Sequence, residues 1–180
     1  MKKLDQPGTG STTGLNGYCS VRSKLGKSDA KLRSAQDTVR NEMYYNPSQK
    51  LADKLGAQLD VTRTQLYDTT IQHGKGSDPD SASALDDALV FLIRESTKGS
   101  SGSTLKINGH NVDEIVWLNK FLEVRTAGLK NPHNKETQNE WLQSITRVKS
   151  YQCAVAQNQY KWGSSIDVLD NDGKATTGKC

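Results

Sequence analysis

Apolar residues recur at spacings of three and four along much of the chain, which is the periodicity of a helix with one buried face. The first such set is Leu32, Ala35, Val39 and Met43. It predicts a helix that begins at Ser28 or Asp29 and carries these apolar residues on one face, opposite charged residues. Because a residue that precedes proline is disfavoured in the helical region, Asn46 is expected to end this helix. Pro47 then opens a short helix that Gly56 terminates.

Four further helices are predicted by the same periodicity, over residues 57–73, about 81–98, about 112–127 and about 135–158. Gly74 and Gly128 are the expected stops of the first and third. The apolar members of three of these helices are Leu59, Leu66, Tyr67 and Ile71, then Ile115, Leu118, Phe121 and Leu122, and finally Trp141, Ile145, Val148 and Val155. No alternating pattern of convincing length predicts a strand. The fold class is therefore predicted to be all-α.

Three segments of the chain differ in composition. Residues 1–16 are rich in glycine, serine and threonine and are expected to form a flexible tether. Residues 17–166 are predicted to form one helical domain, followed by a polar tail, residues 167–180, that turns at Asp170-Asn171-Asp172-Gly173. No apolar stretch approaches the length that spans a membrane, and the two lysines after Met1 are not followed by the apolar core of a signal peptide.

The charge balance is mildly basic, and the distribution of the charges argues against some classes of binding partner. The chain has 24 Lys+Arg and 20 Asp+Glu, a formal net charge of +4. These residues are spread without a long run of one sign, whereas a nucleic-acid groove needs clustered basic residues with stacking aromatics. We expect neither a nucleic-acid partner nor a membrane partner.

No metal or cofactor is implied by the sequence. Cys19, Cys153 and Cys180 form no CxxC pair, and the histidines supply no zinc-ligand spacing. An EF-hand register in the tail places Val168 at the first ligand position and Lys179 at the last, which excludes that motif. Three cysteines allow at most one disulfide, and the sequence does not choose the pair.

Three charged residues lie beside apolar helical positions, where a solvated face is not the obvious location. They are Asp68, Arg125 and Arg147. Taken alone, the pattern allows independent surface charges. If these residues are buried they must pair, because an unpaired buried charge is costly. No Ser/His/Asp or Cys/His set is readable, and composition cannot select two catalytic carboxylates from 20 acidic residues.

Four segments in the same order resemble the chitosanases of glycoside hydrolase family 46, over about residues 28–160. One runs from Ala35-Gln36-Asp37 to Tyr44-Tyr45-Asn46-Pro47. Another is Tyr67-Asp68, followed at family spacing by His73-Gly74 and Asp78-Pro79. The last two are Trp117-Leu118 with Phe121-Leu122 and Arg125, and Arg147-Val148. The resemblance implies the lysozyme-like chitosanase fold, of which the chain would hold the second lobe and the long bent helix.

The same resemblance assigns roles to several residues. Asp68 matches an aspartate that the family holds between two arginines, matched here by Arg125 and Arg147, in a network that supports the catalytic acid from behind. His73 and Asp78 would belong to a possible cleft loop. The family's general-acid Glu and base Asp precede these segments, and neither motif is found. Residues 17–28 match a later linker instead, so no catalytic residue is identified.

Two functions follow from the resemblance. The chain would be a fragment or degenerate member of a family that cleaves β-1,4-linked glucosamine polymers, inactive alone and completed by a missing N-terminal lobe or partner chain. Alternatively it would be a non-catalytic, effector-like secreted protein that binds carbohydrate or another partner. A general basic helical domain is a third reading, which leaves the four segments unexplained. Chitosan or a related amino-sugar polymer is the expected ligand, and secretion is expected by resemblance.

Overall fold

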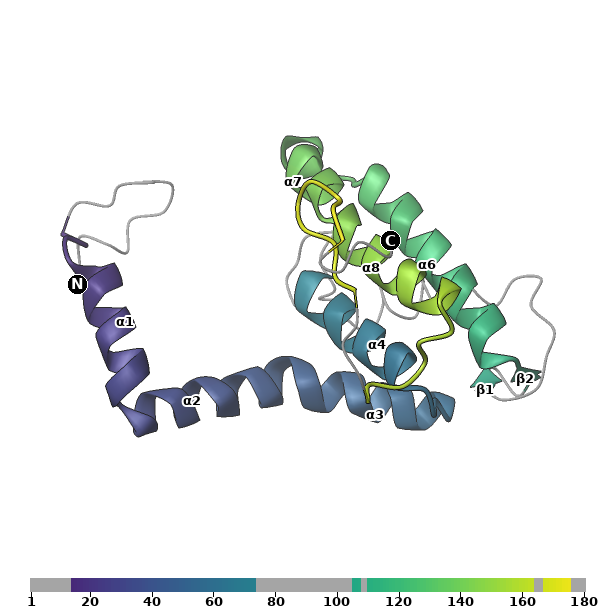
Figure 1. Ribbon diagram of the computed structural model, residues 1–180, viewed down its shortest axis with the longest axis horizontal. Helices are drawn as coiled ribbons and strands as arrows, with labels where there is room; N and C mark the ends of the chain where they lie inside the picture. Colours follow the sequence, from purple (N-terminus) through teal and green to yellow (C-terminus); the bar gives the residue numbers. More distant parts are fainter. Residues whose placement is uncertain (1–13, 74–104, 108–109, 164–166, 176–180) are drawn as a thin grey trace. The chain divides into compact units, whose positions relative to one another are not determined.

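The computed structural model describes residues 14–73, 105–107, 110–163 and 167–175. These residues form helices and one two-stranded sheet, in two compact units, Met1–Glu42 and Met43–Cys180 (Figure 1). The predicted all-α class is confirmed, since each strand has only three residues. None of the helices in these ranges is long and apolar enough to cross a membrane.

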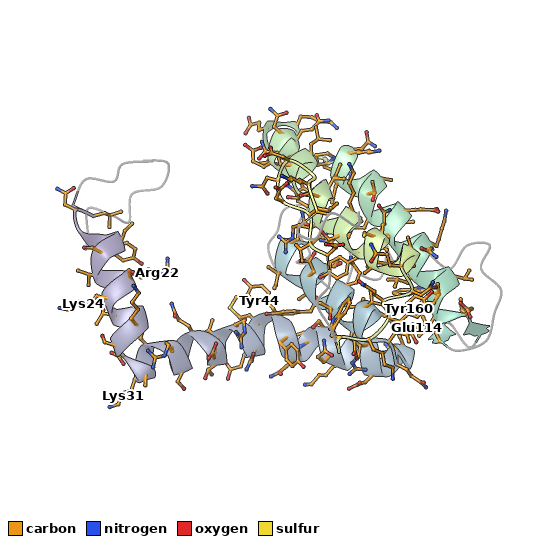
Figure 2. The ribbon with its side chains drawn as sticks, in the orientation of Figure 1. Arg22, Lys24, Lys31, Tyr44, Glu114 and Tyr160 are labelled. Carbon is orange, nitrogen blue, oxygen red and sulfur yellow. The ribbon has the colours of Figure 1, made fainter. Side chains whose placement is uncertain are left out.

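The first unit contains two helices, α1 (Tyr18–Ser28) and α2 (Ala30–Arg40). Asp29 caps α2 by accepting hydrogen bonds from the backbone N–H of Lys31 (2.8 Å) and of Leu32 (3.1 Å), so the predicted helix start is confirmed. Helix α1 was not predicted, because residues 17–28 were assigned to a linker. Basic side chains project from this unit, as Figure 2 shows for Arg22 and Lys24.

The apolar face of α2 is not buried. Neither α1 nor α2 contains a buried residue, and Val39 is 52% exposed. The apolar spacing therefore identified a helix correctly but not a covered face. Periodicity records which residues share a side of a helix, whereas burial also requires an element packed on that side.

Helical structure continues from α2 through Asn46, contrary to the prediction. A π-helical turn, Asn41–Tyr45, leads directly into α3 (Asn46–Leu55). Pro47 lies in the first turn of α3, directly after the π-helical turn. Gly56 ends α3 with φ 75°, as predicted.

Three helices of the second unit enclose its core. These are α4 (Asp60–His73), α6 (Glu114–Lys130) and α8 (Ile145–Ala156); a short helix, α7 (Gln138–Gln143), lies between α6 and α8 in the chain. The predicted core positions that are fully buried are Leu66, Leu118, Phe121, Leu122 and Val148. Ile71, an apolar residue of the same predicted helix as Leu66, is 39% exposed.

Two helix boundaries in this unit differ from the predictions, at Gly128 and at Ser144. Helix α6 passes through Gly128, whose surroundings are open. The helix predicted over residues 135–158 is instead a 3-10 turn, Lys135–Thr137, followed by α7 and α8, which meet at Ser144. The helix predicted from Ser81 lies outside the described residues.

Two short strands were not predicted, β1 (Leu105–Ile107) and β2 (His110–Val112). They pair antiparallel, with Leu105 opposite Val112, and both of these side chains are buried. Three residues are too few to show an alternating pattern, so the sequence could not reveal them.

The chain after α8 returns to α4. The N–H of Val61 donates to the carbonyl of Tyr160 (3.2 Å), and the indole N–H of Trp162 donates to the hydroxyl of Thr64 (2.6 Å). Farther on, the turn predicted at Asp170 to Gly173 is present, with Gly173 at φ 78°. Cys19 is a free, exposed thiol, whereas Cys153 is disulfide-bonded.

Candidate functional site

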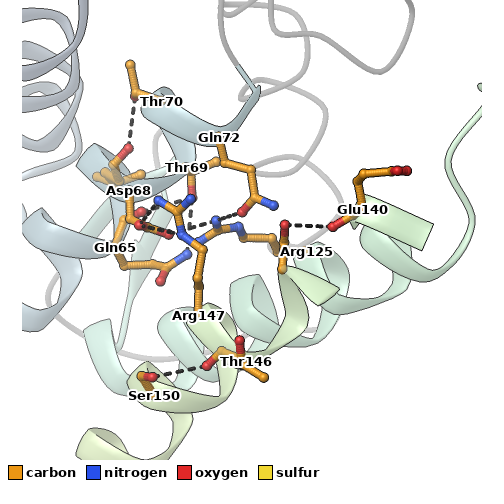
Figure 3. Close-up of polar contacts among 12 residues, drawn as sticks. Gln65, Asp68, Thr69, Thr70, Gln72, Arg125, Glu140, Thr146, Arg147 and Ser150 are labelled. Carbon is orange, nitrogen blue, oxygen red and sulfur yellow. Dashed lines mark hydrogen bonds and ion pairs between the residues drawn. The ribbon is translucent and has the colours of Figure 1, made fainter. Parts of the chain in front are cut away.

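One carboxylate lies between two guanidinium groups where α4, α6 and α8 meet (Figure 3). The Oδ2 of Asp68 accepts a hydrogen bond from Nη2 of Arg125 (2.8 Å). Its Oδ1 accepts from Nε of Arg147 (3.1 Å) and also from Nη2 of the same side chain. The structure therefore brings together the three charged residues that the sequence singled out, from positions 57 and 79 residues apart.

Helical spacing explains why these side chains face inward. Arg125 follows Leu122 by three residues and Phe121 by four, so it extends the buried stripe of α6. Arg147 precedes the buried Val148, and it reaches the same carboxylate from α8. Of the three side chains, Arg125 is fully buried, Asp68 is 14% exposed and Arg147 is 41% exposed.

The burial of Arg125 makes the carboxylate necessary. Burial lowers the pKa of Arg125 below its ordinary value, and the charge of Asp68 opposes this effect. Gln72 assists, because its Oε1 accepts a second hydrogen bond from Nη2 of Arg125. A buried guanidinium without such acceptors would cost several kcal/mol.

Tyr151 completes the surroundings of the network. Burial raises the pKa of its phenol above the ordinary value, and the negative charge of Asp68 raises it further. Sequence reasoning missed both Tyr151 and Gln72. Each lies four residues after a member of the charged trio, Gln72 after Asp68 and Tyr151 after Arg147, so helical spacing could have found them.

The two residues predicted for a cleft loop are not part of this network. His73 ends α4 and is buried, with its ring edge-on to Trp141 at a centroid distance of 5.1 Å. Asp78 lies outside the described residues. Among the residues that are described, no group of three or more metal-ligating side chains occurs.

Another buried carboxylate, Glu114, was missed by the sequence analysis. It is the first residue of α6, and its oxygens accept hydrogen bonds from the backbone N–H of Gln58 and of Leu59. These groups immediately precede α4. Glu114 therefore ties the start of α6 to the turn between α3 and α4, which helps to position the helix that carries Asp68.

Comparison with protein families identifies relatives for this arrangement. The model for "Glycosyl hydrolase family 46" matches residues 1–161. A chitosanase from Bacillus subtilis strain 168 is 36% identical over 172 residues, which are 96% of this chain and 58% of that protein. A chitosanase from Streptomyces sp. strain N174 is 28% identical over 131 residues, which are 72% of this chain and 41% of that protein.

Solved structures of chitosanases share the fold. Native chitosanase from Bacillus subtilis MY002 has a TM-score of 0.70 and 36% identity, over 92% of this chain and 64% of that one. A chitosanase from Gynuella sunshinyii in complex with chitotetraose has a TM-score of 0.72 and 32% identity, over 97% of this chain and 66% of that one.

The present chain thus spans 58% of the length of the Bacillus subtilis strain 168 enzyme and 41% of the Streptomyces one. Its helices have the lysozyme-like all-α fold of these chitosanase structures. Because the family model covers most of the 180 residues, the chain belongs to glycosyl hydrolase family 46.

Proposed function

We propose that this chain carries the charge network of a chitosanase and binds glucosamine polymers, while the catalytic acid and base come from residues outside these 180. The observation that carries the proposal is the exposure gradient across the network. Arg125 is fully buried against Asp68, whereas 41% of Arg147 remains accessible. The Arg147 guanidinium is thereby held in a fixed direction by a largely buried carboxylate, while its side chain remains partly accessible to solvent.

Such an arginine suits an acid that must lose its proton during the reaction. Inverting hydrolysis needs a protonated carboxyl group on one side of the glycosidic bond and a carboxylate on the other, roughly 6.5–9.5 Å apart. The acid becomes an anion when it protonates the leaving oxygen. A preoriented guanidinium stabilises that anion, and Asp68 keeps the guanidinium in place as the charge develops.

The net charge of the network is compatible with such an acid beside it. Arg125 and Arg147 contribute two positive charges and Asp68 one negative charge, so one positive charge is unbalanced. A carboxylate beside Arg147 would balance it. We infer that the network is built for an arriving acidic side chain and not for substrate ammonium groups, which it would repel.

Glucosamine polymers are the proposed ligand because the relatives are chitosanases. One Bacillus subtilis MY002 structure is a mutant complexed with 6 GlcN, at a TM-score of 0.72 and 34% identity, over 97% of this chain and 67% of that one. Chitosan is a polycation at acidic pH and this chain is net basic, so we expect weak binding that depends on local acidic groups and falls with salt.

An extracellular location is part of the proposal. A polysaccharide of high mass does not enter cells, so an enzyme or binding protein for it acts outside. The disulfide at Cys153 fits an oxidising compartment. Detection of the protein in the culture medium tests this location, and confinement to the cell interior would contradict it.

The primary test measures cleavage and binding separately. The purified chain with soluble chitosan should release no reducing ends, while calorimetry with glucosamine hexamer at low salt should show heat that disappears at high salt. Reducing-end release by the chain alone would overturn the proposed absence of the acid and base. No heat at millimolar hexamer would overturn the proposed binding.

A second candidate function is a non-catalytic binding protein. The exposed apolar side chains of α1 and α2 favour it, because they offer a surface for a partner; they are Tyr18, Val21, Leu25 and Val39. Adding the part of the Bacillus subtilis chitosanase that this chain does not match separates the two candidates. Restored cleavage supports the split enzyme, and hexamer binding without cleavage supports the binding protein.

A further inference from the structure

A groove of about 430 Å³ opens in the second unit beside α6, α7, α8 and the turn after Leu169. This volume suits a small ligand or one unit of a larger one. Its wall includes the last turn of α6 at Lys130 and the first turns of α8 at Ile145 and Lys149. No function described above uses this groove.

The charge of the groove is positive. Lys130 and Lys149 line it, and no acidic side chain does. Neither ammonium group forms an ion pair within the part of the chain that the structure describes. The neighbouring Asp170 is engaged elsewhere, because its Oδ1 accepts from the backbone N–H of Asp172 (3.0 Å) and of Lys174 (2.8 Å). Because these two lysines have no carboxylate beside them in the groove, the groove favours the binding of an anion.

The neutral side chains of the groove have unused hydrogen-bonding capacity. Gln143, Gln152 and Asn171 make no side-chain hydrogen bond among the described residues. The hydroxyls of Thr126 and Thr146 donate to helix carbonyls, at 2.7 and 3.2 Å, which leaves their lone pairs as acceptors. Amides and hydroxyls at such density match a ligand that has several hydroxyl groups.

One wall of the groove is apolar. Leu142 is 39% exposed and Ile145 is half-buried, and both line the groove. The C–H face of a pyranose ring packs on such a surface, while its hydroxyl edge requires polar partners. The groove offers both kinds of surface together with two positive charges.

We propose that this groove binds an anionic sugar, whose carboxylate, sulfate or phosphate group lies against Lys130 and Lys149. The amide side chains of Gln143, Gln152 and Asn171 contact its hydroxyl groups. Glucosamine itself is excluded as the preferred ligand, because its ammonium group carries the same charge as the lysines. The groove therefore recognises a second class of saccharide.

The position of the groove keeps this inference independent of the proposed function. Thr126 and Thr146 line it; Thr126 directly follows Arg125 in the sequence, and Thr146 directly precedes Arg147. Consecutive helical residues point about 100° apart, so α6 and α8 present the network and the groove in different directions. Loss of binding in the groove should leave glucosamine-hexamer binding unchanged.

The test is calorimetric titration of the full chain with four probes of known charge: trigalacturonate, glucose 6-phosphate, glucosamine trimer and sodium sulfate. Trigalacturonate or glucose 6-phosphate should bind, and which of them binds identifies the anionic group. Glucosamine trimer should not displace it. Binding of sulfate as tightly as either sugar would overturn the assignment to a sugar, because it would show a simple anion site.

Two pairs of substitutions test whether the anionic sugar binds in this groove. The double variant Lys130→Gln, Lys149→Gln should weaken this binding roughly tenfold or more, since charge-assisted hydrogen bonds are lost. The control double variant Lys54→Gln, Lys161→Gln removes the same charge from exposed positions outside the groove and should keep the affinity within about twofold. Equal losses in both would show a non-specific charge effect and contradict the site. Absence of binding by both anionic sugars would also overturn it.

Discussion

Asp68 is the residue on which the charged network depends. It is the acceptor that Arg125 and Arg147 share, and it joins helices that are remote in sequence. Sequence pattern alone could not decide between paired and independent charges here, because periodicity does not show which helix packs on which. The family resemblance suggested the pairing, and the structure supplies the contacts.

Replacing Asp68 by Asn should destabilise the second unit by about 3–5 kcal/mol, because Arg125 would stay buried without its counter-charge. Urea unfolding at neutral pH measures the change. Asp53→Asn is the matched control, since Asp53 pairs with Arg63 at an exposed position and its loss should cost less than about 1 kcal/mol. Similar losses in both variants would show that burial of the network contributes nothing.

From the raised pKa of Tyr151 we predict a loss of folding stability at alkaline pH. Its pKa is raised in the folded state above the ordinary value of 10.0, so above about pH 10 the folded protein retains a proton that the unfolded chain releases. The free energy of unfolding must then fall as pH rises, by up to about 1.4 kcal/mol per pH unit. In Tyr151→Phe this part of the slope should be absent. Parallel curves for the two proteins between pH 10 and 11 would contradict the burial of the phenol.

At the scale of elements, periodicity found the helices but not their interruptions. It predicted α2, α3, α4, α6 and the region of α8, yet it missed α1, the π-helical turn before α3 and the break at Ser144. The helix stops expected at Asn46 and Gly128 were wrong, whereas the stop at Gly56 was confirmed. Pro47 is accommodated inside a first turn, and Gly128 lies within α6 where its freedom is not needed.

Gly128→Ala should therefore stabilise the protein, by about 0.5–1 kcal/mol, since a Cβ there meets nothing within 4 Å and alanine restricts the unfolded chain. Gly56→Ala is the opposite case, because φ 75° strains any side chain, and it should destabilise by about 1 kcal/mol. Thermal unfolding of both variants measures the signs. Stabilisation in both, or destabilisation in both, would contradict the assigned backbone conformations.

From the hydrogen bonds of Glu114 we predict that its replacement destabilises the turn just before α4. Glu114→Gln should weaken the hydrogen bonds from the N–H groups of Gln58 and Leu59 and cost about 1–3 kcal/mol. Hydrogen exchange should accelerate at these two amides first. Glu123→Gln is the control, because Glu123 pairs with Lys120 on an exposed face. Unchanged exchange at both amides in Glu114→Gln would contradict the role of this carboxylate.

At the scale of the whole molecule, the sequence predicted the fold class and family more reliably than the extent of burial. The four ordered motifs were sufficient for the family, and the family model covers residues 1–161. The exposed apolar faces of α1 and α2 could not be foreseen, because the pattern of a buried helix and of an uncovered one is the same. The tether, domain and tail boundaries stay predictions.

The most direct test of the network's role is chitosan cleavage by this chain mixed with the part of the Bacillus subtilis strain 168 chitosanase that it does not match. The mixture should release reducing ends that neither component releases alone. Arg147→Ala should abolish this release without preventing folding, whereas Arg40→Ala, at an exposed position, should leave it unchanged. Full activity of the Arg147→Ala mixture would contradict the proposal that the network serves an acid from outside the chain.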